Sequence, residues 1–259
     1  MNQELVIAIK ELITKAGHIA LEARKDGIKV EWKEDNSPVT NADKAISQYI
    51  FDGLSKLKPE IPIICEERPL VSIDKDKPFW LVDPIDGTRS FISNKDSFTV
   101  NIALIDNREA VCGFIYQPTK KMLYFTDENK QFCIEQNGKS ITRNIHNQDG
   151  FVAIVSSNSF NSVTANYLKE NDFIEVISIP SSLKLCLIAE GIGDVFPKFG
   201  TTMEWDIAAG HALIKAAGGD IYLLDGGLML YAKDNFRNSH FIAANKKWLS
   251  TAIERRSCS

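Results

Sequence analysis

Clustered cysteines and long apolar runs are both missing from this sequence, and their absence excludes several classes of protein. The five cysteines among 259 residues are far apart and form no CxxC pair or Cys/His cluster, which argues against a thiolate metal site or a disulfide framework. No apolar stretch reaches the roughly 18 residues that a membrane-spanning helix needs, and residues 1–10 show no signal-peptide pattern. We therefore expect a cytoplasmic protein with reduced cysteines and no integral membrane segment.

A strong excess of one charge is also missing. Lys and Arg number 30 against 34 Asp and Glu, a net charge of −4, so no broad basic surface indicates a nucleic-acid or lipid partner. An acidic protein that handles a polyanionic substrate needs metal ions or a local basic patch. The hydrophobic fraction of 44% and the charged fraction of 25% are those of an ordinary globular protein. The length suits one large domain or two small ones.

Apolar periodicity divides the chain near Asn144. In residues 1–144 it predicts a helix over 5–23 and a second helix that begins at Thr40 or Asn41 and ends by Pro59. A strand at 29–34 and a turn at 35–38 are expected between them. Six further strands are predicted at 61–65, 79–82, 98–105, 110–116, 122–126 and 131–135. The tight turns between the later strands favour an antiparallel sheet.

Residues 145–259 change rhythm, because strands and helices alternate. Helices are predicted at 160–169, 183–190, 204–217 and 246–254, and strands at 152–156, 173–179, 195–196, 221–224, 228–231 and 241–244. This alternation favours a mixed sheet with crossover helices. We expect two packed sub-domains, 1–144 and 145–259, in an α+β protein.

Residues 81–91, LVDPIDGTRSF, contain the most informative pattern. Asp83 and Asp86 follow an apolar strand, and two neighbouring carboxylates repel each other unless a cation lies between them. Mg²⁺ takes oxygen ligands and commonly uses one or two carboxylates together with substrate phosphate. Pro84 stiffens the turn, which leaves the carbonyl of Ile85 available to the same ion.

The two residues that follow are suited to an anion. Gly87 allows close backbone approach, and the N–H groups after Thr88 could open a short helix whose positive end faces phosphate. The alternative from the residues alone is an Asx-turn whose aspartates bond only their own backbone.

Other acidic residues stand where predicted strands end or helices begin. Glu66 and Glu67 end one strand, Asp43 lies in the first turn of a helix, and Asp206 opens another. Each alone has an ordinary explanation, since acidic side chains are favourable at helix N-termini. Spacing cannot show that they meet in space.

Several of these segments resemble the inositol monophosphatase-like superfamily of Mg²⁺-dependent, lithium-sensitive phosphomonoesterases. The superfamily resemblance rests on VTNAD, EE, LVDPIDGT and EWDIAAGHALIKAAGG. Within it, DNSPVTNAD, FTVNIALI, SSLKLCLIAEG and FPKFGTTMEWD look like the 3′(2′),5′-bisphosphate nucleotidase (CysQ-type) branch. The resemblance runs from about residue 5 to residue 241. It implies a layered α/β/α/β/α sugar-phosphatase-like fold with an antiparallel N-terminal sheet and a mixed C-terminal sheet.

The resemblance also implies a metal site with two or three Mg²⁺ ions. Glu66, Asp83 and the Ile85 carbonyl would hold the first ion. Asp83, Asp86 and Asp206 would hold the second, so that Asp83 bridges. Inhibition by Li⁺ and by excess Ca²⁺ would follow.

Catalytic and substrate-binding roles are carried over in the same way. Thr88 and Asp43 match the pair that orients and deprotonates a metal-activated water. The residues expected to contact substrate are Glu66, Ile85, Asp86, Gly87, Thr88, Ser181, Ser182, Lys184 and Asp206.

The chain departs from the branch pattern at some substrate-facing positions. Pro180 replaces a glycine, which removes a backbone donor. The branch has Arg and His after the strand at 152–156, where this chain has the stretch that ends at Phe160. Thr202, Cys65 and the pair Arg89-Ser90 also replace usual residues. These changes bear on nucleotide preference and leave the predicted metal ligands untouched.

The leading hypothesis is therefore a phosphatase that removes the 3′-phosphate of adenosine 3′,5′-bisphosphate, and of 3′-phosphoadenylyl sulfate as a further substrate. The first alternative is an inositol or sugar monophosphatase of the same superfamily. The second is a non-catalytic regulatory domain that binds phosphate. We expect a small phosphorylated partner, a monomer or weak homodimer, and a cytoplasmic location, with peripheral binding to the inner face of the cell membrane as the other option.

Overall fold

The structure is a computed structural model that describes residues 1–142, 149–157 and 160–257. The predicted boundary between residues 144 and 145 lies outside the described residues, so the division into two sub-domains stays a prediction. Part of the segment that departs from the branch pattern, Asn158 and Ser159, also lies outside them. None of the described helices has the length and apolar character to cross a membrane.

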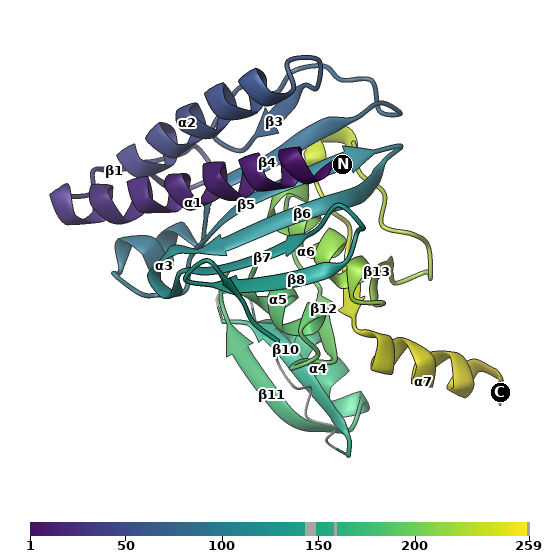
Figure 1. Ribbon diagram of the computed structural model, residues 1–259. Helices are drawn as coiled ribbons and strands as arrows, with labels where there is room; N and C mark the ends of the chain where they lie inside the picture. Colours follow the sequence, from purple (N-terminus) through teal and green to yellow (C-terminus); the bar gives the residue numbers. More distant parts are fainter. Residues whose placement is uncertain (143–148, 158–159, 258–259) are drawn as a thin grey trace.

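Two long helices cover one face of a seven-stranded sheet (Figure 1). The helices are α1 (Gln3–Asp26) and α2 (Asn41–Leu57). The strands, in spatial order, are β3 (Ile63–Cys65), β4 (Phe79–Asp86), β5 (Thr99–Asp106), β6 (Glu109–Gln117), β7 (Met122–Thr126), β8 (Phe132–Gln136) and β9 (Lys139–Ser140). Neighbours from β4 to β9 are antiparallel, as predicted. The prediction misses that β3 runs parallel to β4 at the sheet edge.

A second sheet of five strands forms the other half of the molecule. Its order is β11 (Phe173–Ile179), β10 (Phe151–Ser156), β12 (Val195–Lys198), β14 (Phe241–Ala244) and β13 (Asp220–Leu223). The first three strands are mutually parallel and the last two pairings are antiparallel, which confirms the mixed sheet.

The predicted strand at 228–231 is wrong. Only an isolated bridge joins Leu228 to Tyr222. The backbone beyond it has other partners, because the N–H of Tyr231 donates to the carbonyl of Arg108 at 2.9 Å. The N–H of Ala232 donates to the Glu204 carboxylate at 2.9 Å. A regular ladder would have to break both hydrogen bonds.

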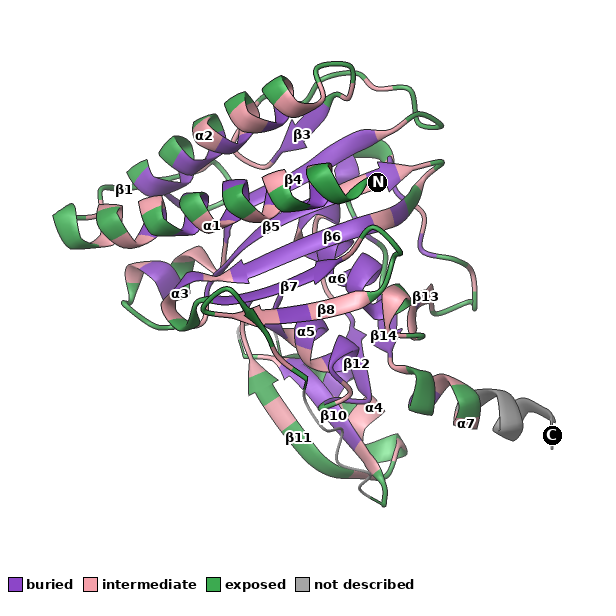
Figure 2. Ribbon diagram, in the orientation of Figure 1, coloured by how far each residue is buried: buried purple, intermediate pink, exposed green. Residues whose placement is uncertain are grey.

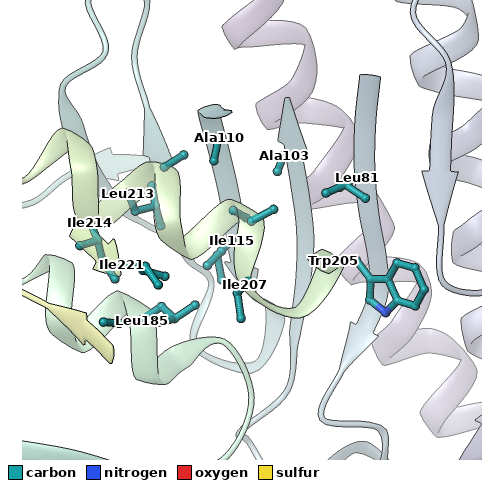
Figure 3. Close-up of a cluster of buried hydrophobic side chains, with 14 of the residues drawn as sticks. Leu81, Ala103, Ala110, Ile115, Leu185, Trp205, Ile207, Leu213, Ile214 and Ile221 are labelled. Carbon is teal, nitrogen blue, oxygen red and sulfur yellow. The ribbon is translucent and has the colours of Figure 1, made fainter. Parts of the chain in front are cut away.

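Helices fill the space between the sheets and cover the outer face of the second one. Between them lie α5 (Leu183–Ala189) and α6 (Glu204–Ala216), and outside lie α4 (Ser162–Glu170) and α7 (Lys246–Ser257). Figure 3 shows side chains of α6 and α5 meeting Leu81, Ala103 and Ile115 of the first sheet. The resulting α/β/α/β/α order confirms the predicted fold. Figure 2 shows β4 to β7 buried along most of their length, with the outward sides of α1 and α2 exposed.

Short elements complete the chain. A hairpin of β1 (Val30–Trp32) and β2 (Pro38–Thr40) precedes α2. The strand β2 was not predicted, because its residues follow a turn signal. The remaining elements are α3 (Thr88–Ile92) and the 3₁₀ turns η1 (Pro118–Lys120) and η2 (Asp234–Phe236).

Helix α6 approaches the seven-stranded sheet so closely that one strand residue must be glycine. A Cβ added to Gly113 of β6 would lie 2.1 Å from the carbonyl oxygen of Ala209. A backbone oxygen in the middle of a buried helix cannot move aside as a flexible side chain can. The contact therefore fixes the position of α6 against the sheet.

We predict that Gly113→Ala lowers the free energy of unfolding by about 3 kcal/mol, the upper end for an overpacked core. Urea unfolding followed by circular dichroism measures the change. The control is Gly138→Asn, at an exposed turn with positive φ where nothing lies within 4 Å of an added Cβ, since Asn tolerates that conformation. Equal stability of wild type and Gly113→Ala would contradict the close contact.

Candidate active site

A bulge in β4 turns two aspartates toward the same side of the sheet. Asp83 lies opposite Asn101 of β5 and Asp86 opposite Thr99, so β4 has one more residue than its partner over this stretch. Residues three apart on a regular strand would face opposite sides. The extra residue of the bulge therefore brings Asp83 and Asp86 to the same side. Pro84 is tolerated there because a bulge needs one ladder hydrogen bond fewer.

That side is the one covered by α5 and α6. Phe79 and Leu81 of β4 point into the core between the sheets, and Asp83 continues their alternation. On the neighbouring strand, Ile64 belongs to the same core, and Glu66 follows two residues later. The N–H of Glu66 donates to the carbonyl of Val82 at 3.2 Å. Glu66 therefore leaves the sheet on the same side as both aspartates.

Helix α6 supplies the fourth acidic side chain. Asp206 is in its first turn, and its Oδ2 accepts a hydrogen bond from the N–H of Met203 at 2.8 Å. The capping bond fixes the carboxylate at the start of the helix that packs on the face carrying Asp83. The four predicted carboxylate ligands thus converge on one region.

Burial and mutual proximity raise the pKa values of carboxyl groups in this cluster. Burial raises the pKa of Asp83 well above its ordinary value, and the charges of Glu66, Asp86 and Asp206 raise it further. The pKa of Asp206 is raised to about 8 by burial and then by Asp86 and Glu66. Burial also raises the pKa of Glu66, although the Lys33 ammonium opposes the shift. When ionised, each carboxylate of this cluster therefore destabilises the others.

The carboxylates are held by protein donors in this structure. Lys33 Nζ donates to Glu66 at 2.9 Å and to Glu67 at 2.7 Å, and the Ser182 hydroxyl donates to Asp86. Over the described residues, no three acidic, His or Cys side chains already form a ligand cage. The donor chemistry nevertheless fits a hard divalent cation, because the buried donors are oxygens and their repulsion is what such a cation relieves.

The predicted catalytic pair lies beside this cluster, with each member bonded to another group. Asp43 is buried at the start of α2 and accepts a hydrogen bond from the N–H of Thr40 at 2.8 Å and another from its hydroxyl. The Thr88 hydroxyl donates to the carbonyl of Ile85 at 3.1 Å. A relay between Thr88 and Asp43 requires the threonine to turn away from that carbonyl, so this role stays a prediction.

The environment of Asp43 suits proton transfer near neutral pH. Burial raises its pKa to about 6, while the hydrogen bonds from Thr40 oppose the shift. A general base is most effective when its pKa lies near the working pH.

Gly87 joins the acidic strand to α3 through a conformation that favours glycine. Its φ of 89° is left-handed. An added Cβ would lie 3.0 Å from the carbonyl oxygen of Ser97 and 3.2 Å from Cβ of Ser181. The first amides of a helix have no partner within it, and the role of the Gly87 and Thr88 N–H groups toward phosphate oxygens stays a prediction.

A pocket of about 180 Å³ opens beside the carboxylates. It brings together six predicted site residues: Asp86, Gly87, Ser181, Ser182, Lys184 and Asp206. The other predicted residues, Asp43, Glu66, Asp83, Ile85 and Thr88, are outside its lining. The lining therefore combines acidic, hydroxyl and ammonium groups.

Ser182 connects β4, β5 and α6 at the pocket. Its hydroxyl accepts from Asn101 Nδ2 at 2.8 Å, donates to Asp86 and lies 3.0 Å from the carbonyl of Asp206. The preceding Ser181 has a positive φ of 58° and follows the rigid Pro180. Its carbonyl accepts from Lys184. Burial lowers the pKa of Lys184 to about 8, and Asp86 opposes this change.

Sequence reasoning missed three polar residues of the site. Lys33 pairs with Glu66, Asn101 positions Ser182, and Lys198 lines the pocket. Lys198 was overlooked because the strand was predicted to end at residue 196, whereas β12 continues to Lys198. The available signal was its place in FPKFGTTMEWD, a segment used only for the resemblance.

A buried carboxylate cluster facing lysines and serines, on a five-layered fold, defines the class of sugar-phosphatase-like proteins. Comparison with known proteins agrees. The model of the Inositol monophosphatase family matches residues 1–259, and the chain belongs to the inositol monophosphatase family.

Several relatives are similar to this chain in sequence over nearly its whole length. The chain is 36% identical to the 3′(2′),5′-bisphosphate nucleotidase CysQ of Buchnera aphidicola over 93% of this chain and 94% of that one. It is 36% identical to the protein of the same name from Salmonella typhimurium, over 89% and 96%. The crystal structure of CysQ from Bacteroides thetaiotaomicron superposes with a TM-score of 0.79 at 34% identity, over 94% and 98%.

The raised pKa of Asp206 makes stability depend on pH. Between the ordinary carboxyl pKa and about 8, the folded chain keeps a proton that the unfolded chain has released. The free energy of unfolding therefore falls as pH rises through this range. In metal-free buffer with chelator, we expect the free energy of unfolding of Asp206→Asn to fall less steeply with pH than that of wild type. At pH 8 the variant should be more stable than wild type by about 1–2 kcal/mol.

Asparagine keeps an oxygen acceptor for the N–H of Met203, so this change tests charge alone. Urea unfolding from pH 5 to pH 8 measures it. The matched control is Asp225→Asn, an exposed turn residue whose Oδ1 accepts from the N–H of Gly227 at 2.8 Å. The control should follow the wild-type slope. Parallel slopes for wild type and Asp206→Asn would contradict the prediction.

Proposed function

We propose that this chain is a metal-dependent phosphomonoesterase, a 3′(2′),5′-bisphosphate nucleotidase that removes the 3′-phosphate of adenosine 3′,5′-bisphosphate. The observation that carries the proposal is the convergence of Glu66, Asp83, Asp86 and Asp206 beside a pocket that holds Lys184. Relatives that bear this activity in their names align over most of the chain. The sulfated nucleotide, 3′-phosphoadenylyl sulfate, is a further proposed substrate.

Mg²⁺ is the proposed cofactor, with two or three ions in the site. Glu66, Asp83 and the Ile85 carbonyl would hold one ion, and Asp83, Asp86 and Asp206 another. When bound, the ions lower the pKa of water and neutralise phosphate charge. The support is chemical, because a divalent cation relieves the repulsion among these buried carboxylates while all of them are ionised.

The chain's own residues perform the remaining steps. Asp43, with a pKa of about 6, is ionised at neutral pH and accepts the proton of the attacking water through the Thr88 hydroxyl. The N–H groups of Gly87 and Thr88 orient the phosphate that is cut. Ser181, Ser182 and Lys184 bind the rest of the substrate in the pocket. Hydrolysis is direct and needs no side-chain nucleophile.

One observation favours inositol or sugar monophosphates as substrates, which would be hydrolysed by the same chemistry. Pro180 has no backbone donor, and the next residue, Ser181, has a left-handed backbone with a φ of 58°, at the position expected to face the nucleotide. Inositol or sugar monophosphates, which need no nucleotide contact, are therefore the second candidate. The complete set of acidic and hydroxyl residues argues against a non-catalytic regulatory domain. A cytoplasmic location and a monomer or weak homodimer stay predictions.

Phosphate release measured with the purified chain tests the proposal. Adenosine 3′,5′-bisphosphate, inositol 1-phosphate and a sugar phosphate are compared with Mg²⁺ and with chelator. We expect release from the nucleotide that depends on Mg²⁺ and exceeds release from the other two. Asp83→Asn should abolish it. Preference for inositol 1-phosphate would favour the second candidate, and release from none of the three would defeat both.

Asp43→Asn tests the base separately from the metal site. The amide cannot accept the proton but keeps an oxygen for Thr40. We expect kcat to fall by roughly 10²–10⁴, the usual range for loss of acid–base help, while the Mg²⁺ concentration for half-maximal activity changes little. Near wild-type kcat would mean that another group takes the proton. Asp52→Asn, at an exposed residue of the same helix α2 whose Oδ1 accepts from Gln48 Nε2 at 2.8 Å, serves as the matched control.

A further inference from the structure

The seven-stranded sheet contains a buried asparagine that the proposed mechanism does not use. Asn101 of β5 is 1% exposed, and its Nδ2 donates to the Ser182 hydroxyl at 2.8 Å. We propose that Asn101 is a positioning residue, which directs the Ser182 proton to Asp86. It thereby holds the Asp86 carboxylate in place for a divalent cation, a role that rests on the proposed function.

The sheet places Asn101 on the same face as the acidic cluster. Asn101 lies opposite Asp83 in the antiparallel pairing of β5 with β4, and directly opposed side chains share one face of a sheet. Further along β5, Ala103 and Ile105 alternate with outward residues and belong to the core between the two sheets, where Figure 3 labels Ala103. Asn101 therefore continues an apolar face of the strand to the point where that face reaches the carboxylates.

Stability alone does not account for an asparagine at this position. The Oδ1 of Asn101 is buried and has no hydrogen-bond partner among the residues that the structure describes. A buried polar atom that is left unpaired lowers stability, and an apolar side chain of similar size would avoid that cost. The presence of the amide is therefore better explained by the hydrogen bond that its Nδ2 makes.

The hydrogen bonds around Ser182 have one consistent direction. A hydroxyl has a single proton to donate, and Ser182 donates it to the Asp86 carboxylate. A carboxylate is a stronger acceptor than the neutral backbone carbonyl of Asp206, which lies 3.0 Å from the same hydroxyl. The Asn101 atom beside the hydroxyl oxygen must then be a donor. Without that donor, the Ser182 hydroxyl is free to turn toward the Asp206 carbonyl.

Ser182 stands before α5 but does not cap it. It is the N-cap residue of that helix, yet its side chain accepts no hydrogen bond from the first-turn amides, which the structure describes. Serine at an N-cap commonly accepts such a bond. Here the hydroxyl is committed to Asn101 and Asp86 instead. Hydrogen-bond partners that orient a metal ligand in this way typically change metal affinity by roughly tenfold to a hundredfold.

Calorimetric titration with Mg²⁺ tests the role of Asn101 without turnover. Asn101→Ala, Ser182→Ala and the double variant are compared with wild type. We expect the Kd for Mg²⁺ to rise about tenfold in Asn101→Ala and at least as much in Ser182→Ala. Because both residues act through one chain of hydrogen bonds, the double variant should bind Mg²⁺ no more weakly than Ser182→Ala. Two losses that multiply in the double variant would overturn the assignment, because Asn101 would then act independently of Ser182.

The matched control is Asn245→Ala. Asn245 is a half-buried asparagine immediately before α7, whose Nδ2 donates to the carbonyl of Gly193 at 3.1 Å and to Asp194 at 2.9 Å. Its loss should lower the melting temperature and leave the Kd for Mg²⁺ unchanged. The same behaviour in Asn101→Ala would show that Asn101 is only structural. Asn101→Leu, which keeps the volume without the donor, takes its place in the titration if the melting temperature shows that Asn101→Ala has lost the fold.

Phosphate release from adenosine 3′,5′-bisphosphate separates the role of Asn101 from the proposed function. At low Mg²⁺ we expect kcat/KM of Asn101→Ala to fall about tenfold, and saturating Mg²⁺ should restore most of it. If wild type binds Mg²⁺ but releases no phosphate, the proposed function is wrong and the titrations still decide the role of Asn101. If wild type is active and Asn101→Ala binds Mg²⁺ equally well, only the role of Asn101 is wrong. A wild type that binds no Mg²⁺ would reject both.

Discussion

Repulsion among buried carboxylates is the constraint on which the rest of this structure depends. Asp83 is buried with Glu66, Asp86 and Asp206 close enough to raise its pKa, so the metal-free cluster opposes folding. Packing elsewhere must outweigh that cost. The cores on the two faces of the seven-stranded sheet, one covered by α5 and α6 and the other by α1 and α2, provide the apolar burial that does so. Function and stability thus conflict at one site, as is common where pKa values are strongly perturbed.

Local devices, each short in sequence, bring the acidic groups together. The bulge around Pro84 turns Asp86 to the side of Asp83. A capping hydrogen bond holds Asp206 at the start of α6, and another holds Asp43 at the start of α2. Ser182 then connects Asp86 to the second half of the chain. The site is therefore built at the ends of regular elements, where side chains project without disturbing the ladders behind them.

Much of this arrangement could be predicted from the sequence, and the exceptions have physical reasons. The long periodic helices α1 and α2 and most strands were predicted, because burial on one face leaves a clear repeat. The parallel pairing of β3 was missed, since direction depends on a connection and not on the strand itself. The apolar run at 228–231 reads as a strand, but its backbone bonds to Arg108 and Glu204. Lys198 was missed because the strand was predicted to end at residue 196, two residues before the end of β12. The predicted metal-ligand positions came from family resemblance, which supplies the distant contacts that spacing cannot.

The close approach of Gly113 to Ala209 has a consequence for how this architecture can diversify. With a backbone oxygen where a methyl group would have to fit, no larger residue can replace Gly113 unless α6 moves away from the first sheet and the interior repacks. Related proteins that accept larger or smaller substrates would then have to change the size of the pocket through the loops that follow the strands. The packed contact between the first sheet and α6 would keep the acidic residues in place, while the loops remain free to vary in sequence and length.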